Sequence, residues 1–200
     1  MEAAVSPLQN RWTLRDFITL AIFNVVMLII MTICPIFTFA SYLVVGGITA
    51  LLNAPLYVVM SNKINKRGVL FFTSVITGLY FIAYGYAYFL LVLACMGIVG
   101  ELVLWGKDGY KNPVRNAIAY ALFYVGYSLC AIVPLIFFRD AYIATLSKSY
   151  SKAAMDKMLY YYSTPSMAIT MLAISAAGGL LGCLIGNVLF KKHVKKAKLA

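Results

Sequence analysis

Six apolar stretches alternate with short polar gaps along this chain of 200 residues, and lysine and arginine gather in every second gap. A helix needs roughly 20 apolar residues to cross the hydrocarbon core of a bilayer, with a range of about 17–25. A helix also satisfies its own backbone hydrogen bonds, which lipid cannot do. The pattern therefore predicts an all-α, polytopic membrane protein with six transmembrane helices, at approximately residues 17–33, 36–60, 69–84, 87–105, 117–138 and 167–190.

Positive charge is distributed unevenly between the two sets of gaps. Thirteen of the 17 lysines and arginines lie before the first stretch or after the second, fourth and sixth, and the other four follow the fifth. Cytoplasmic loops of membrane proteins carry such an excess. We therefore expect both termini in the cytoplasm, a basic cytoplasmic tail at 191–200 and an outer loop at 139–165. Because the cations flank apolar stretches and form no separate soluble domain, they do not indicate a nucleic-acid-binding protein.

The composition, 63% apolar, predicts a single membrane domain over residues 1–200. The sequence contains no catalytic motif and no metal-binding motif. Its only histidine, His193, lies in the basic tail. Glu101 is the one acid well inside an apolar stretch, and its position near the cytoplasmic interface favours a contact with Lys107 or another helix end over a proton relay. We therefore expect no enzymatic activity, and no metal or cofactor belonging to the protein itself.

Several local signals predict where the helices begin, bend and end. Such signals include capping residues, proline in a first turn, proline inside a helix, and glycine in a turn. They are Thr13 with Asp16 before the first stretch, Cys34-Pro35 after it, Asn53 with Pro55 in the second, Gly85 between the third and fourth, Asn112-Pro113 before the fifth, and Ser163-Thr164 before Pro165.

The outer loop contains the pattern of an amphipathic helix. Met155, Met158, Leu159 and Tyr162 recur at spacings of three and four residues. Such a helix between the fifth and sixth spans would either lie on the bilayer surface or fold over an external cavity as a lid. The spacing alone leaves both arrangements open.

Aromatic residues and methionines concentrate near the expected outer face. Ligand sites are mostly apolar and aromatic, with a few polar groups that fix the ligand. Tyrosines also anchor helices at the membrane interface, which accounts for some of these residues. The candidate substrate-binding residues are Tyr84, Tyr86, Tyr88, Arg139, Tyr142, Tyr161, Tyr162, Met167 and Met171.

Two of the predicted spans carry small residues at every fourth position. Small residues allow helix backbones to approach closely in lipid. This pattern indicates either packing inside the six-helix bundle or a docking face for another membrane subunit. The residues are Gly46, Ala50 and Ala54 in the second span and Gly178, Gly182 and Gly186 in the sixth.

Taken together, several short motifs resemble one family of membrane proteins. They are Leu14-Arg15-Asp16, Asn53-Ala54-Pro55-Leu56-Tyr57, Phe138-Arg139-Asp140-Ala141-Tyr142, the glycine-rich sixth span and the closing Lys191-Lys192-His193-Val194-Lys195-Lys196-Ala197. With these motifs the chain resembles the S components of energy-coupling factor (ECF) transporters, and among them the Trep-Strep or MptD-like group.

The resemblance implies a six-helix substrate-capture subunit of an ABC-type importer in the bacterial cytoplasmic membrane. Such a subunit takes up a scarce nutrient at the outer face and docks on a transmembrane coupling subunit with two ATPase subunits. S components often carry an Ala-x-x-x-Ala docking motif in the first helix. Here Ala21 is followed four residues later by Val25, a departure that shifts the expected docking toward the stripes of the second and sixth spans.

The substrate implied by the resemblance is open. Some relatives are associated with haem acquisition, and Tyr or Met side chains can serve as axial ligands to haem iron. Haem or a related tetrapyrrole is therefore one expectation, with a vitamin or another small planar nutrient as the alternative. A structural or assembly protein that packs against membrane partners without transport is a further alternative.

Overall fold

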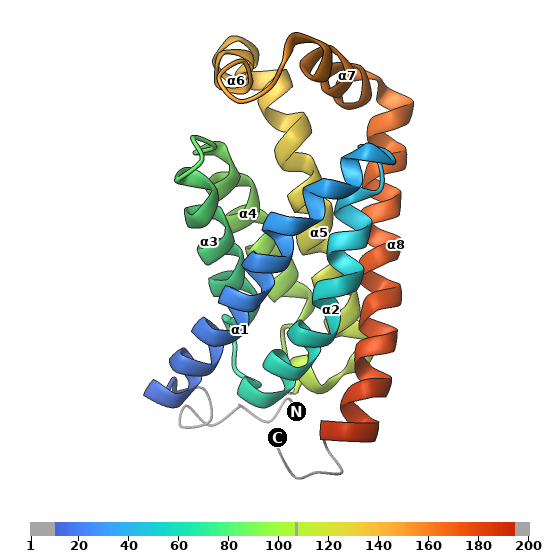
Figure 1. Ribbon diagram of the computed structural model, residues 1–200. Coiled ribbons are helices and arrows are strands. Elements are labelled where there is room, and N and C mark those ends of the chain that lie inside the picture. Colours follow the sequence, from blue (N-terminus) through green and yellow to red (C-terminus); the bar gives the residue numbers. More distant parts are fainter. Residues whose placement is uncertain (1–10, 107, 195–200) are drawn as a thin grey trace.

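The computed structural model describes residues 11–106 and 108–194 of the chain. Within these ranges the chain is helical and contains no strand. Four long helices and one shorter hairpin form the body of the bundle, and two short helices lie across one end (Figure 1). In chain order the helices are α1 (Leu14–Ile33), α2 (Val45–Ile64), α3 (Val69–Ile82), α4 (Tyr88–Val103), α5 (Pro113–Phe137), α6 (Arg139–Leu146), α7 (Lys152–Ser163) and α8 (Pro165–Leu189).

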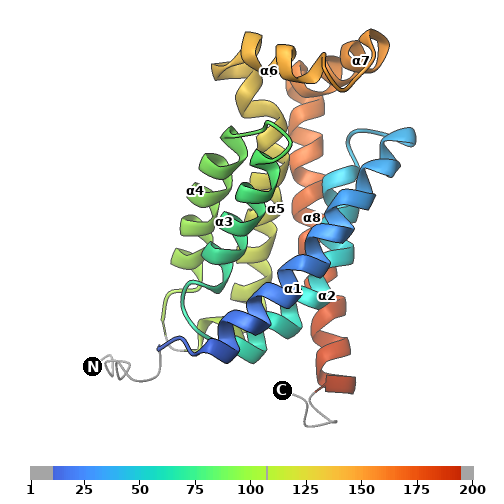
Figure 2. The ribbon, with the colours of Figure 1, turned by 60° about the vertical axis from the view of Figure 1, so that its left-hand side comes forward.

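Four helical segments are long and apolar enough to cross a bilayer. They are Leu14–Phe39, Val45–Ile64, Pro113–Phe137 and Pro165–Lys192. The hairpin helices α3 and α4 have 14 and 16 residues, and at 1.5 Å per residue they are about 21 and 24 Å long. They lie side by side as a shorter pair (Figure 2). The structure therefore supports a polytopic membrane protein with four clear spans and an apolar hairpin.

The predicted capping signals at two helix starts are confirmed. The Thr13 side chain accepts a hydrogen bond from the Asp16 N–H, and the Asp16 side chain accepts one from the Thr13 N–H. The Asn112 side chain accepts bonds from the N–H groups of Val114 and Arg115. Because these caps precede the apolar stretches, α1 begins before residue 17 and α5 before residue 117. Gly85, with a φ of 86°, turns the chain between α3 and α4 as predicted.

The predicted second span, 36–60, is wrong at its start. The chain continues from α1 into a 3₁₀ helix, Cys34–Phe39, and α2 begins only at Val45. Proline has no N–H and its ring clashes with the carbonyl four residues earlier, so Pro35 ends the α-helical ladder. The tighter 3₁₀ turn accommodates it near its own start. The link between α1 and α2 is therefore longer than expected, and it supplies residues to the outer end of the bundle.

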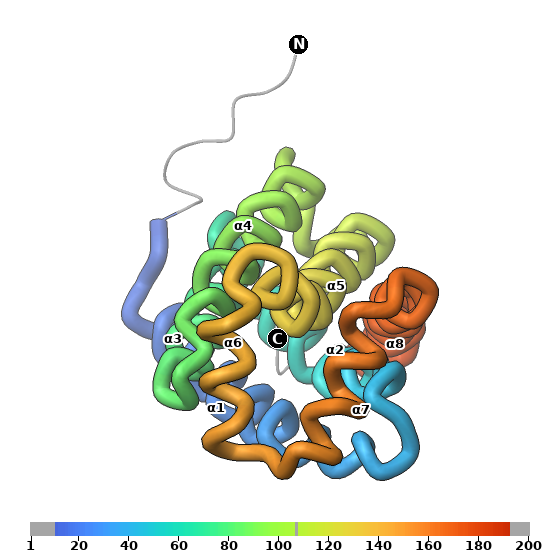
Figure 3. Tube along the Cα trace, turned by 90° about the horizontal axis from the view of Figure 1, so that it is seen from above, coloured from blue at the N-terminus to red at the C-terminus, as the bar shows by residue number. Residues whose placement is uncertain are grey.

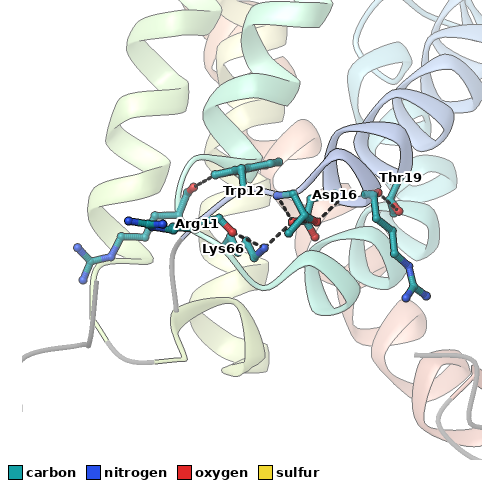
Figure 4. A network of polar contacts seen from close by, with 8 residues as sticks. Arg11, Trp12, Asp16, Thr19 and Lys66 are labelled. Carbon is teal, nitrogen blue, oxygen red and sulfur yellow. Dashed lines mark hydrogen bonds and ion pairs between the residues drawn. The ribbon is translucent and has the colours of Figure 1, made fainter. Parts of the chain in front are cut away.

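Helix α1 crosses the bundle at an angle to α2 and is held at its first turn by a polar network (Figure 4). The Lys66 ammonium group, in the loop between α2 and α3, contacts the Asp16 carboxylate and the Arg11 carbonyl. The Trp12 indole N–H donates to the Arg67 carbonyl at 3.1 Å. The start of α1 is thus tied to a loop 55 residues away in sequence. Farther along, only four residues of α1 are buried.

Helices α2 and α8 pack together through their small residues. A Cβ atom added at Gly182 would lie 2.6 Å from Ala54 Cβ and 3.0 Å from the Leu51 carbonyl oxygen. One added at Gly186 would lie 3.1 Å from Pro55 Cα. Real Cβ atoms essentially never lie 2.6 Å from another heavy atom, and contacts of 3.0–3.1 Å are tighter than most, so glycine is what allows this approach. The structure therefore shows the stripes engaged in packing within the bundle.

Pro55 inside α2 lies against α8. It leaves the Leu51 carbonyl without its helical donor, and this carbonyl lies against Gly182 of α8. The nearby Asn53 side chain does not reach that carbonyl and donates to the Met27 carbonyl at 3.2 Å and the Tyr124 hydroxyl at 2.7 Å. Asn53 thus links α1, α2 and α5 in the bundle core.

The cation-rich gaps meet at one end of the bundle. The start of α1, the loop between α2 and α3, the segment between α4 and α5, and the end of α8 all lie at the lower end in Figure 1, opposite α6 and α7. This placement agrees with the predicted charge asymmetry. We call it the basic end, and the end with α6 and α7 the capped end.

Candidate functional site: an aromatic cavity at the capped end

A cavity of about 400 Å³ lies at the capped end, between the bundle and helices α6 and α7. Its walls come from the α1–α2 link, the start of α2, the α3–α4 hairpin, α5, α6, α7 and α8. Figure 3 shows α6 and α7 lying across the bundle when it is seen from this end. The lining residues are Pro35, Thr38, Phe39, Tyr42, Val45, Gly46, Phe81, Tyr86, Phe89, Tyr127, Ser128, Ala131, Tyr142, Leu146, Tyr150, Met158, Tyr162 and Met171.

A small apolar cluster holds α6 and α7 over the cavity. Its buried members are Leu135, Tyr142, Leu146 and Met158. Met155, Leu159 and Tyr162 pack against it, so the apolar face predicted for the outer loop is confirmed and points toward the bundle. Of the two arrangements left open by the sequence, the structure shows the helix folded over a cavity. The preceding helix α6, which was not predicted, completes the cover.

Aromatic rings form much of the cavity wall. The Tyr86 and Tyr142 ring centroids lie 6.4 Å apart in an edge-to-face arrangement, and those of Tyr42 and Tyr162 lie 6.1 Å apart. Such pairs favour fixed ring orientations. The Phe81 ring centroid lies 5.9 Å from that of Tyr127. The cavity thus presents ring faces and edges contributed by segments far apart in sequence.

One polar contact lies at the wall shared by α2, α5 and α8. The hydroxyl groups of Ser128 and Ser175 are hydrogen bonded at 2.6 Å. Gly46 faces this pair, and a Cβ there would lie 2.5 Å from the Ser128 oxygen. The absence of a side chain at Gly46 therefore leaves the hydroxyl pair room beside the cavity.

The cavity lining is electrically neutral. The lining residues, all from the described part of the chain, include no Asp, Glu, Lys or Arg. Burial raises the pKa values of the Tyr42, Tyr86, Tyr142 and Tyr162 phenols above their ordinary value. These hydroxyls therefore stay protonated at neutral pH and act as hydrogen-bond donors and acceptors. Outside the lining, the Lys157 Nζ lies 5.9 Å from the ring centroid of the lining residue Tyr42.

The structure brings together four of the nine predicted substrate-binding residues. Tyr86, Tyr142, Tyr162 and Met171 line the cavity. The other five do not line it: Tyr84, Tyr88, Arg139, Tyr161 and Met167.

Each of the tyrosines outside the lining has another identifiable contact. Tyr84 is exposed, and its hydroxyl lies 2.8 Å from that of Tyr80. Tyr88 stacks on Phe138 at 5.8 Å, and Tyr161 packs beside Tyr42 at 5.6 Å. Tyr88 and Tyr161 thus pack on lining residues from outside the cavity, since Tyr88 also contacts Tyr142. Arg139 lies exposed at the start of α6.

Several lining residues were not among the predicted site residues. Tyr42 and Phe39 come from the link that was expected to be a very short turn, so the misplaced start of α2 hid them. Tyr127 lies in the middle of α5, where tyrosine was not separated from ordinary core residues. Met158 could have been selected, since it belongs to the amphipathic pattern of α7. The pattern did not show, however, whether the apolar face points toward the bundle or toward the bilayer surface.

The predicted docking residues divide into two groups. Gly46, Ala50, Ala54, Gly182 and Gly186 are buried inside the bundle, and Gly178 packs against Gly47 of α2. Ala21 and Val25 instead lie on the exposed side of α1. That side is almost entirely apolar, with Ile18, Ile22 and Ile29 also exposed.

Comparison with known proteins gives one family. The model of a family described as a hypothetical bacterial integral membrane protein (Trep_Strep) matches residues 14–196. The match covers all eight helices and both ends of the bundle. Neither the curated proteins nor the solved structures contain a significant match to the chain.

Proposed function

This chain belongs to the Trep_Strep family of bacterial integral membrane proteins, and from that premise we propose that it is the substrate-binding S component of an ECF-type importer. In this proposal it lies in the cytoplasmic membrane with six crossings, the basic end in the cytoplasm and the capped end outside. It captures a scarce nutrient and delivers it through a coupling subunit and two ATPase subunits. It catalyses no reaction itself.

The observation that carries the proposal is the aromatic cavity under α6 and α7. Its volume of about 400 Å³ lies in the range of roughly 300–1,000 Å³ that small-molecule sites occupy. It lies at the end opposite the excess of positive charge, which is the outer end if cytoplasmic loops carry that excess. A covered, neutral, aromatic cavity at the outer face suits the capture of a dilute nutrient.

The properties of the cavity bear on the choice between the two expected substrate classes. Met158, Met171 and the tyrosines supply side chains of the types that ligate haem iron. Propionates would pair with cations, but the four cations of the predicted outer loop do not line the cavity: Arg139, Lys148, Lys152 and Lys157. A tetrapyrrole would thus have to place its propionates at the rim, whereas a smaller planar nutrient would fit within the neutral lining. We propose the smaller class, and haem is the alternative that absorbance distinguishes.

The exposed side of α1 is the proposed contact for the coupling subunit. The stripes of α2 and α8 pack against each other, so they offer little surface to a partner. Ala21 and Val25 lie on an apolar side of a helix with few buried residues. The polar contacts that tie α1 to the bundle come from other residues, such as Asp16, Asn24 and Thr32. The alternative of an assembly protein was based on free small-residue stripes, and their use within the bundle removes that support.

Co-purification and ligand analysis together test this proposal. The tagged chain is expressed with the coupling subunit and ATPases of its own cell, and the bound small molecule is identified by mass spectrometry and absorbance. We expect the module to co-purify and one nutrient to be retained. Replacing Tyr162 with Ala should release the nutrient, because this side chain lines the cavity. Replacing its exposed neighbour Tyr160 with Ala should not.

Three results would contradict the proposal. They are failure of the wild-type chain to associate with the coupling subunit, absence of any retained nutrient after growth in rich medium, and equal retention by the Tyr162 and Tyr160 variants. A Soret band in the purified complex would instead assign the cavity to haem.

A further inference from the structure

We infer that the cavity at the capped end selects an uncharged, planar heteroaromatic nutrient whose edge carries several hydrogen-bonding groups, and that the phenol hydroxyls of the lining bind that edge. The inference rests on the proposed capture of a nutrient in this cavity, and it names the chemistry of that nutrient. The phenols belong to Tyr42, Tyr86, Tyr127, Tyr142, Tyr150 and Tyr162.

These six phenol hydroxyls have no hydrogen-bond partner within the described part of the chain. The other two hydroxyls of the lining are engaged with protein groups. Thr38 Oγ1 donates to the Pro35 carbonyl at 2.7 Å, and the Ser128 hydroxyl pairs with that of Ser175. Tyrosine hydroxyls normally find a partner when their rings are buried. The six phenols therefore need their partners from whatever occupies the cavity.

Tyrosines in the bundle core show the usual pairing. The Tyr120 hydroxyl donates to the Ala50 carbonyl at 2.8 Å, and the Asn53 side chain donates to the Tyr124 hydroxyl at 2.7 Å. Tyr142 is only 3% exposed, yet its unpaired hydroxyl is not among the atoms sealed inside the protein, so it opens onto the cavity that Tyr142 lines. In the described chain, the unpaired polar atoms that are sealed inside belong to Asn24, Asn53, Tyr57 and Asn116.

The aromatic wall favours a flat ring as the ligand. Nine of the lining side chains are tyrosine or phenylalanine. The Phe89 ring centroid lies 5.3 Å from that of Tyr86 and 4.7 Å from that of Phe81, and Phe81 in turn contacts Tyr127. These contacts make a continuous wall from the hairpin to α5. Aromatic side chains stack on planar heterocyclic rings, so such a ring contacts the wall while its edge reaches the hydroxyls.

The charge of the cavity favours an uncharged ligand. The lining, which lies within the described residues, offers no charged side chain, and burying an unpaired charge is costly. Burial raises the pKa values of the Tyr142 and Tyr162 phenols, so these groups are also neutral at pH 7. Lys157 lies beside the outside of the Tyr42 ring, which disfavours a cationic ligand further. Neutral phenols donate well to carbonyl oxygens and ring nitrogens of an uncharged heterocycle.

Matched probes test the selection on the purified full chain. Three pairs differ by a carboxylate: nicotinamide and nicotinate, pterin and pterin-6-carboxylate, and lumiflavin and 10-carboxymethylflavin. The thermal unfolding midpoint is measured in detergent at pH 6.5 with an excess of each probe. A ligand that binds the folded chain raises this midpoint. We expect the largest rise from an uncharged probe, a smaller rise from its carboxylate partner, and no larger rise from the cation 1-methylnicotinamide than from nicotinamide.

Removal of single hydroxyls locates the effect. Tyr142→Phe and Tyr162→Phe keep the ring, and each should weaken binding of the best uncharged probe roughly two- to tenfold, the range for one hydrogen bond. Tyr160→Phe is the matched control, because Tyr160 is exposed on the same helix as Tyr162 and lies outside the lining. It should bind the probe as the wild type does. If one of the two variants does not fold, Tyr86→Phe at the hairpin turn takes its place.

Three outcomes would overturn the inference. They are a larger rise of the midpoint with a charged probe than with every uncharged one, no rise with any uncharged probe, and equal probe affinity in the wild type and the lining variants.

The importer role and this inference fail separately. A chain that binds an uncharged probe but does not associate with the coupling subunit refutes the importer role and leaves the inference standing. A chain that associates with the coupling subunit and retains an anionic or cationic nutrient supports the importer role and overturns the inference.

Discussion

At the scale of single residues, Glu101 shows how a charged group is accommodated in an apolar helix. Its Oε1 accepts the N–H groups of Leu70 at 3.0 Å and Phe71 at 3.3 Å, and it contacts the Tyr110 hydroxyl. Helix α3 follows Gly68, which has no side chain to cap it. The Glu101 carboxylate of α4 therefore does the capping, at the positive end of the α3 dipole. The predicted contact with another helix end is present, whereas Lys107 lies outside the described residues.

Replacing Glu101 with Ala is expected to destabilise the protein. The change leaves the Phe71 N–H and the buried Tyr110 hydroxyl without their acceptor, and the Leu70 N–H keeps only its bond to the Tyr110 oxygen. Hydrogen bonds to charged groups contribute about 1.5–3 kcal/mol each. Denaturant or thermal unfolding in detergent measures the loss. The Gln variant keeps an acceptor oxygen and should lose less. An Ala variant as stable as the wild type would refute the capping role, and a Gln variant that is stable but transports nothing would restore the proton-relay interpretation.

At the scale of helices, the contact between α2 and α8 makes Gly182→Leu a test of the packing. A leucine there would meet Ala54 and the backbone of Leu51, where even a Cβ lies too close. Overpacking of this kind costs about 1–3 kcal/mol. We expect a lower unfolding midpoint and poor assembly. Ala177→Leu, at an exposed position of the same helix, should have little effect. If both variants melt like the wild type, the two helices do not pack as closely as the structure indicates.

The helices also show which features the sequence could predict. Starts and turns were predictable because their causes are local: Thr13 and Asn112 cap the helices that they precede, and Gly85 makes a turn. Contacts between segments far apart in the sequence could not be predicted, because their causes are not local. The small-residue stripe that contains Gly182 could pack against a helix of the same chain or against another subunit. Only the folded structure shows that it packs against Ala54. For the same reason the sequence predicted an aromatic site but selected only some of its tyrosines.

At the scale of the whole molecule, the length of the α3–α4 hairpin decides how the capped end lies relative to the bilayer. The Tyr86 ring at the hairpin turn contacts Tyr142 of α6, so the turn reaches the capped end. Helix α5, with 25 residues, spans about 37 Å, whereas α3 spans about 21 Å. Since the hydrocarbon core is about 30 Å thick, α6 and α7 would stand clear of it while the hairpin turn lies lower, within the cavity wall.

Labelling of single cysteines in intact cells tests this arrangement, starting from a variant in which Cys95, the exposed native cysteine, is replaced. An impermeant maleimide should label Tyr160→Cys in α7 quickly. It should label Tyr84→Cys at the hairpin turn more slowly, because that position is closer to the lipid. Lys63→Cys and Lys192→Cys, at the basic end, should react only after the cells are permeabilised. Labelling of Lys192→Cys and Tyr160→Cys from the same side would show that α8 does not cross the membrane, and it would refute the predicted topology. If Tyr84→Cys reacts only in permeabilised cells, the α3–α4 hairpin does not cross the membrane, and the outer cavity lacks one of its walls.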